Sequence, residues 1–176
     1  MVARSRRKLY GDVWPIHPEA ADPPEGWAGW PDGKKFALVL MHDVDTAIGQ
    51  QNIFNLMNLE LELGFKSCFN LVPEGYKCDP EIREVLKANG FGIGVHGLIH
   101  EGRVFQDRKK FEKAVPKINK YMEDWSTPVF SSPSMLGNLD WISRLNIECD
   151  CSTFDTDPFE PQANDVETIF PLIIVD

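Results

Sequence analysis

The stretch FALVLMHDVDT, residues 36–46, is an apolar run that ends in two acids and leads directly into a helical pattern. A short, nearly continuous apolar run of this kind is typical of a strand that is buried on both faces. The same order returns in FGIGVHGLIHEG, residues 91–102, where an apolar, glycine-punctuated run ends in His96 and His100. Both stretches predict strands that carry polar residues at their carboxyl ends.

Strand and helix patterns alternate along the chain. Apolar runs predict strands at residues 35–42, 66–73, 91–96, 128–133, 147–154 and 168–176. Helical spacing and capping residues predict helices at residues 46–64, 79–90, 106–125 and 138–146. This alternation predicts an α/β fold with parallel strands and right-handed crossovers. In such sheets and barrels, active sites gather at the carboxyl ends of the strands, so residues far apart in sequence meet at one rim.

Individual residues mark the ends of two of these helices. Gly64 suits the C-cap of the helix at residues 46–64. Asp79 suits an N-cap, Pro80 the first helical position, and Gly90 the position beyond the end of the helix at residues 79–90. The helix at residues 46–64 has helical spacing in its apolar residues Ile48, Phe54, Met57 and Leu61.

The composition argues against several classes of function. The chain has 176 residues, which suits a single domain, and a formal net charge of −9, which disfavours nucleic-acid binding. No apolar run approaches the roughly 18 residues needed to span a bilayer. No apolar segment follows the basic start MVARSRRKLY, so we expect no secretory signal, a cytoplasmic location and reduced cysteines. Cys149 and Cys151 share one predicted strand and are expected to point to opposite faces of it.

The N-terminal part differs in composition from the rest of the chain. Residues 11–35 carry five prolines and three tryptophans. Because proline fixes φ and removes a hydrogen-bond donor, neither a long helix nor a central strand fits here. The tryptophans indicate a packed arm rather than a free linker. We therefore divide the chain into an N-terminal arm, residues 1–35, and a (β/α) domain, residues 36–176.

Histidines and acids at the predicted strand ends indicate a metal site. His96 and His100, spaced H-x-x-x-H, can bind one ion from a turn or a helical segment, although an isolated pair also suits structural histidines. HDVD adds Asp43 and Asp45. One acid would complete a three-ligand set and the other could act as a general base. A helix N-cap is the alternative role, but it accounts for one acid and not for two.

Four segments carry a family resemblance: FALVLMHDVDT, GVHGLIHEG, FSSPSMLGN and STFDTDPFEP start at residues 36, 94, 130 and 152. Together they resemble the motifs of the polysaccharide deacetylase family (carbohydrate esterase family 4), in the subgroup with a D-x-D first motif. The resemblance extends from about residue 26 to about residue 170. It implies a distorted or incomplete (β/α) barrel, and a hydrolase that removes acetyl groups from N- or O-acetylated sugars.

The resemblance also implies roles for individual residues. Asp45, His96 and His100 look like the ligands of a divalent metal, typically zinc. Asp43 looks like the general base that activates water for attack on the acetyl carbonyl. The resemblance further implies substrate contacts for Ser132, Pro133, Asp155 and Asp157. For the acidic segment that holds Asp155 and Asp157, a proline-bounded structural loop is the alternative interpretation.

The chain departs from the family pattern in two places. Ser131 stands where the family has an arginine that pairs with the catalytic aspartate, and serine supplies no cationic fork. No histidine follows His100, whereas the family has a late strand and a histidine that serves as general acid. We therefore expect either a truncated product, lacking the last strand and motif of the family, or an impaired enzyme.

Three functions follow from these residues. The first is a metal-dependent deacetylase. The second is a catalytically impaired homologue that binds a glycan or another small ligand, and the third is a hydrolase of a non-sugar amide. The expected partners are an acetylated carbohydrate or a small amide. A barrel left open would also favour a partner chain, as in a homo-oligomer, or poor solubility.

Overall fold

The computed structural model describes residues 18–153 and 168–171. The chain divides into two compact units, one formed by Leu38–Ser152 and the other by Met1–Ala37 together with Thr153–Asp176. The boundaries that the sequence predicts, an arm at residues 1–35 and a domain at residues 36–176, stay predictions.

Five parallel strands form the sheet of the unit Leu38–Ser152, in the spatial order β1-β2-β3-β4-β5. The strands are β1 (Met41–Val44), β2 (Cys68–Leu71), β3 (Gly92–His96), β4 (Val129–Ser131) and β5 (Cys149–Asp150). The helices are α2 (Ala47–Leu63), α3 (Pro80–Ala88), α4 (Arg108–Trp125) and α5 (Leu139–Ile142), with short 3-10 helices η3 (Gly102–Gln106) and η4 (Pro133–Met135). The predicted α/β fold with parallel strands is confirmed, and the described sheet is open, with β1 and β5 at its edges.

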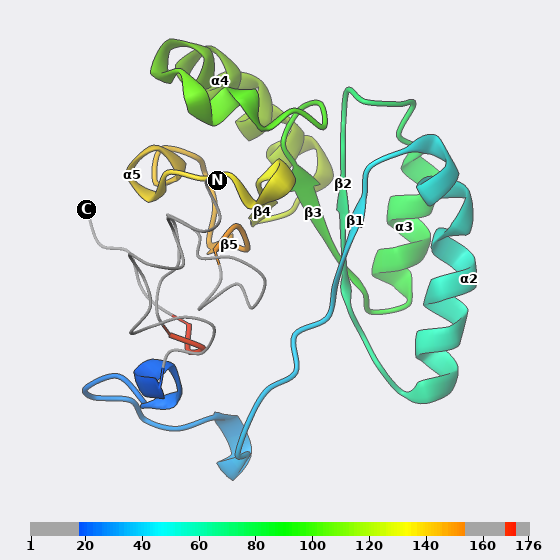
Figure 1. Cartoon of the computed structure of the whole chain (residues 1–176). Helices are drawn as coiled ribbons and strands as arrows, with labels where there is room; N and C mark the ends of the chain where they lie inside the picture. The colour runs from blue at the N-terminus through cyan, green and yellow to red at the C-terminus, as the bar shows by residue number, and fades with distance from the viewer. Residues whose placement is uncertain (1–17, 154–167, 172–176) are drawn as a thin grey trace, which may run out of the picture. The chain divides into compact units, whose positions relative to one another are not determined.

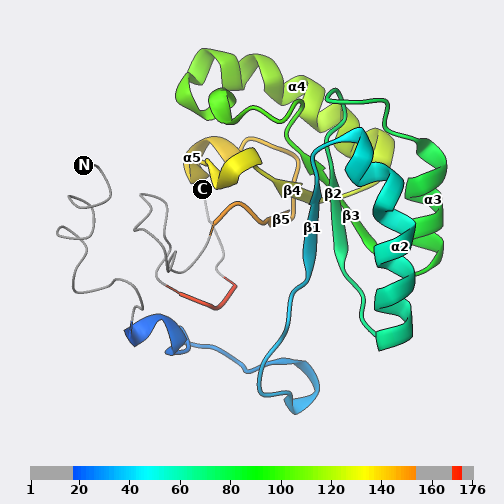
Figure 2. The same ribbon diagram turned by 45° about the vertical axis from the view of Figure 1, so that its right-hand side comes forward.

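Helices α2 and α3 lie side by side along the β1–β3 part of the sheet (Figure 1, Figure 2). Helix α4 contacts α3. The Arg83 guanidinium of α3 lies over the Trp125 ring of α4, 4.8 Å from its centroid. Buried Phe111 and Ile118 of α4 join the same core as Phe130 of β4. No helix within the described ranges is long and apolar enough to cross a membrane.

The predicted caps of two helices agree with the structure, whereas α4 begins at Arg108 and not at residue 106, and α5 ends at Ile142 and not at residue 146. The Thr46 hydroxyl accepts a hydrogen bond from Gly49 N (3.1 Å) at the start of α2, and Gly64 ends that helix with φ +76°. A left-handed φ suits glycine, which lacks a Cβ atom. Asp79 caps α3 by accepting from Glu81 N (3.0 Å), with Pro80 as the first helical residue.

The two faces of the sheet differ in chemistry. Side chains alternate between the faces of a strand, so the strand register decides which residues are neighbours. The face covered by helices carries Phe69, Leu71, Ile93, Val95 and Phe130, each at most 4% exposed. The opposite face carries Asp43, Asn70, Gly94, His96 and Ser131, as the register shows. Full burial of one large apolar side chain contributes about 1.5–3 kcal/mol, so the apolar face anchors the strands whose other face is polar.

The first strand begins later than the sequence pattern predicts. The strand starts at Met41, where pairing with β2 begins, and not at residue 35. The preceding Phe36, Leu38 and Val39 are therefore 77%, 66% and 75% exposed, and the prediction that this run is buried on both faces is wrong.

Other local predictions are also corrected. Of the four apolar residues at helical spacing in α2, only Met57 is buried. Strand β5 is limited to Cys149–Asp150, and residues 168–171 form no strand, while the rest of the predicted last strand lies outside the described residues. Cys149 and Cys151 do not point apart, since their Sγ atoms lie 3.7 Å from each other. Alternation with period two brings residues i and i+2 to the same face, which the prediction overlooked.

The unit Met1–Ala37 with Thr153–Asp176 contains the short 3-10 helices η1 (Pro18–Ala21) and η2 (Pro31–Gly33). Trp27 and Trp30 meet edge to face with centroids 5.2 Å apart, and Phe170 stacks on Trp30 at 6.0 Å. Ile169 N also donates to Ala20 O (2.9 Å), so segments from both ends of the chain hold this unit together.

Candidate metal centre

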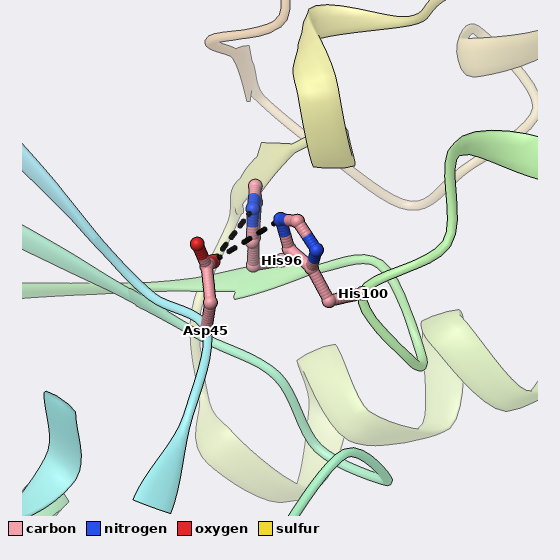
Figure 3. A group of neighbouring side chains, drawn as sticks. All are labelled: Asp45, His96 and His100. Atoms are coloured by element: carbon pink, nitrogen blue, oxygen red, sulfur yellow. Dashed lines mark ion pairs between the residues drawn. The ribbon is translucent and has the colours of Figure 1, made fainter. Parts of the chain in front are cut away.

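Three predicted ligands converge at the carboxyl ends of β1 and β3. Asp45 follows β1, His96 is the last residue of β3, and His100 lies in the loop that follows (Figure 3). Asp45 Oδ1 lies 3.4 Å from His96 Nε2 and 3.4 Å from His100 Nε2. One ligand atom from each residue falls within 4.8 Å of the other two, so the group could hold a metal ion.

The environment of the Asp45 carboxylate fits a cation. Asp45 Oδ1 is shielded from solvent and accepts no hydrogen bond, although the side chain as a whole is 40% exposed. A buried carboxylate oxygen without a partner is costly. Two imidazole nitrogens and one carboxylate oxygen form a common zinc ligand set, and a divalent ion among them would give Asp45 Oδ1 the partner that it lacks.

His96 is held with its Nε2 atom toward Asp45. Its ring is 1% exposed, and Nδ1 lies 3.0 Å from the Ser131 carbonyl oxygen. A carbonyl oxygen only accepts, so Nδ1 carries the proton and the lone pair resides on Nε2. Burial lowers the pKa of His96, while the Asp43 and Asp45 carboxylates oppose the shift. The buried ring is thus favoured in the neutral, ligating form.

Asp43 stands beside the three converging residues and has a specific hydrogen-bond partner. Asn70 Nδ2 donates to Asp43 Oδ1 (2.9 Å), while Asp43 Oδ2 lies 3.8 Å from His96 Nε2. Asn70 is fully buried on β2, between the two strands that carry the candidate ligands. A Cβ atom on Gly94 would collide with Asn70 Oδ1, so the glycine of β3 makes room for this amide.

The backbone between the two acids is fixed as well. The Tyr76 hydroxyl donates to the Val44 carbonyl oxygen (2.6 Å) and accepts from Val72 N (3.4 Å). Burial raises the pKa of Tyr76, so the hydroxyl keeps its proton and remains a donor. This bridge ties the end of β1 to the segment that follows β2.

Sequence reasoning missed both Asn70 and Tyr76. Asn70 did leave a signal, since it is a polar residue inside the apolar run SCFNLV of residues 67–72. A polar side chain in such a strand needs a hydrogen-bond partner, and the partner follows from the register that pairs Asn70 with Asp43.

The residues predicted to contact substrate do not join the three candidate metal ligands. Ser132 and Pro133 are buried: Ser132 N donates to Ser152 Oγ (2.8 Å), and the Pro133 ring packs against Gly97. Ser131 pairs with His96 in the β3–β4 register. Asp155 and Asp157 lie outside the described residues. The substrate contacts of all four predicted residues stay predictions.

No protein-family model matches this chain. No curated protein matches it either. Among solved structures, a protein described as a polysaccharide deacetylase from Mycobacterium smegmatis is similar, with TM-score 0.61 and 19% identity over 77% of this chain and 57% of that chain. A family 4 carbohydrate esterase from Streptomyces lividans, in complex with acetate, has TM-score 0.51 and 12% identity over 62% of this chain and 57% of that one.

A mutant of the peptidoglycan deacetylase PdaC from Bacillus subtilis is also similar, with TM-score 0.50 and 14% identity over 62% of this chain and 55% of that chain. The chain thus spans a little over half of the length of these structures. At such identities the likeness shows the fold, and it agrees with the predicted architecture.

Proposed function

We propose that this protein is a metal-dependent hydrolase that removes acetyl groups from N- or O-acetylated sugars. The observation that carries the proposal is the convergence of Asp45, His96 and His100, with the Asp43 carboxylate 3.8 Å from His96 Nε2. This arrangement combines three metal ligands with a carboxylate outside the ligand set. Hydrolysis by an activated water requires both. The similarity in fold to deacetylases supports the choice of an acetyl substrate.

Asp45, His96 and His100 would hold the divalent ion, for which zinc suits the two imidazoles and one carboxylate. When bound, the ion supplies Lewis-acid polarisation of the acyl group and lowers the pKa of water. The Ser131 carbonyl keeps the proton on His96 Nδ1, so that Nε2 is available as a ligand.

Asp43 is the proposed general base. Because Asn70 occupies Oδ1, the other carboxylate oxygen is left to accept a proton from the attacking water. Addition of that water to the acyl carbon is followed by breakage of the bond to the sugar nitrogen or oxygen. The leaving group then takes a proton, which Asp43 holds after the first step and can return.

We also propose roles for the other four residues that the sequence predicts to contact substrate. Asp155 and Asp157 would border the substrate groove. Ser132 and Pro133 are buried and would support the substrate site indirectly, because their contacts hold the loops that follow β3 and β4.

Two measurements test the proposal: zinc content after reconstitution, and acetate release from acetylated chito-oligosaccharides. His100→Ala should lose zinc and turnover together. Asp43→Asn should keep zinc and lose turnover by about 10²–10⁴-fold, the usual contribution of a general base. Asp140→Asn, a change of an exposed acid on α5, is the matched control and should keep both.

The outcomes separate the competing functions. A chain that binds no zinc after reconstitution would refute the proposal. Zinc binding without acetate release from any glycan would favour a catalytically impaired glycan-binding homologue. Turnover of small amides alone would favour a hydrolase of non-sugar amides.

A further inference from the structure

A second reactive cluster lies at the edge strand β5 and shares no residue with the candidate metal centre. Cys149 is exposed and Cys151 is half-buried, and their Sγ atoms lie 3.7 Å apart. Both are free thiols. The spacing of two residues puts them on the same side of the strand.

Exposure favours Cys149 as the attacking thiol, because Cys151 is half-buried. Its hydrogen bond with Cys151 lowers the pKa of Cys149 to about 7, although partial burial and the Asp150 carboxylate oppose the shift. The same hydrogen bond and burial raise the pKa of Cys151, and the neighbouring Cys68 adds to that rise. Burial also raises the pKa of Cys68 to about 12 and raises that of Cys78. Among the four cysteines, Cys149 alone is exposed with a lowered pKa.

We propose that Cys149 and Cys151 form a redox-modification site, at which a small disulfide oxidant converts the two thiols into an intramolecular disulfide. The Cys149 thiolate attacks one sulfur of the oxidant and expels one thiolate, which leaves a mixed disulfide on Cys149. Cys151 then gives its proton to solvent and attacks the Cys149 sulfur, which expels the second thiolate. The protein loses two electrons and two protons, and the oxidant becomes two thiols.

The modification would act on the candidate metal centre through a short chain of contacts. A disulfide brings the sulfurs from 3.7 Å to about 2 Å and fixes the geometry of both side chains, and we infer that this shifts the backbone of residues 149–151. The next residue, Ser152, accepts a hydrogen bond from Ser132 N (2.8 Å). The residue before Ser132 is Ser131, whose carbonyl oxygen orients His96 (3.0 Å). Oxidation should therefore disturb the orientation of His96, an effect that rests on the proposed metal-binding function.

The first test concerns the thiols alone. The full chain is treated with oxidised glutathione near neutral pH, and free thiols and peptide masses are measured. We expect the loss of two of the four thiols with no retained glutathione, a disulfide in the peptide that holds residues 149 and 151, and full reversal by dithiothreitol.

Variants identify the two roles. Cys151→Ser should trap one glutathione on Cys149, whereas Cys149→Ser should lose the reaction. Cys78→Ser is the matched control, a half-buried cysteine outside this pair, and should behave as the parent chain. Four thiols left unreacted, or equal reaction of the Cys149→Ser chain, would overturn the assignment.

The second test measures zinc affinity of the reduced and the oxidised chain. A Cys149→Ser/Cys151→Ser double variant shows whether zinc binds independently of these sulfurs. We expect the double variant to match the reduced chain and the oxidised chain to bind zinc about 10- to 100-fold more weakly, the range for a disturbed ligand partner. Unchanged affinity after oxidation would refute the link to His96. Thiol closure in a chain that never binds zinc would refute the proposed function and leave the modification site standing.

Discussion

The Asp43 carboxylate has a neutral hydrogen-bond partner. Ser131 supplies no charge to it, and the amide of Asn70 donates to Oδ1 instead (2.9 Å). An amide donor orients a carboxylate without adding a positive charge. With Oδ1 bound to Asn70, the other oxygen of Asp43, Oδ2, lies 3.8 Å from His96 Nε2.

Asn70→Ala should therefore impair turnover and not metal binding. We expect acetate release to fall about 10- to 100-fold, as for loss of a partner that orients a functional group, with zinc affinity nearly unchanged. Steady-state rates and zinc titration of the same preparation measure the two effects. Asn55→Ala, a change of an exposed asparagine on α2, should alter neither. Equal losses of rate in both variants would contradict the role of Asn70.

Burial of His96 predicts acid sensitivity of the metal-free protein. Burial lowers the pKa of His96 in the folded chain, whereas the unfolded chain keeps a histidine pKa of about 6.5. Below that pH the unfolded state binds more protons, so the free energy of unfolding decreases as the pH falls through 6.5 toward the folded pKa. Urea unfolding at a series of pH values measures this slope. His96→Asn, which keeps a donor for the Ser131 carbonyl, should flatten it; an identical slope in the variant would contradict the assignment.

At the scale of elements, one buried acid joins three segments around β1. Glu60 of α2 is 5% exposed; its Oε1 lies 2.7 Å from His42 Nε2 of β1, and its Oε2 accepts from Ser67 Oγ (2.7 Å) next to β2. His42 alternates with Asp43, so this contact on the helix side holds the strand that carries the acids on its other side.

Glu60→Ala should loosen this junction. Loss of the shared acceptor leaves His42 and Ser67 without their partner, and we expect the free energy of unfolding to decrease by about 1–3 kcal/mol. Denaturant titration measures the decrease. Glu62→Ala, on the exposed side of the same helix, should change stability little, because surface substitutions usually stay within about 0.5 kcal/mol. Similar losses in both variants would indicate a general effect on the helix instead.

At the scale of the whole molecule, an ion at the candidate centre would join the carboxyl ends of two different strands. Asp45 follows β1, and both histidines belong to β3 and its loop, with β2 between them. An ion that binds the folded chain and not the unfolded chain stabilises the folded state by mass action.

Zinc should therefore raise the melting temperature. At a free concentration about 100 times Kd the gain is about 2.7 kcal/mol, which corresponds to a rise of about 5–10 °C for a chain of this size. Thermal unfolding with and without zinc measures the rise, and a chelator should reverse it. Asp45→Asn should remove most of the effect. A rise of equal size in that variant would place the ion elsewhere.

The alternation of strands and helices, the caps of two helices and the four polar residues at the carboxyl ends of β1 and β3 could all be predicted from the sequence. These signals are local: periodicity, caps and the order of elements depend on residues a few positions apart. The start of β1 and the partner of Asp43 could not be predicted in this way. The proximity of Cys149 to Cys151 was predicted wrongly, although period-two alternation implies it. Asn70 and Asp43 are 27 positions apart, and only the parallel register of β1 and β2 makes them neighbours. Likewise, Phe36 and Val39 are exposed because strand pairing starts at Met41, a boundary set by the partner strand and not by the hydrophobicity of the run.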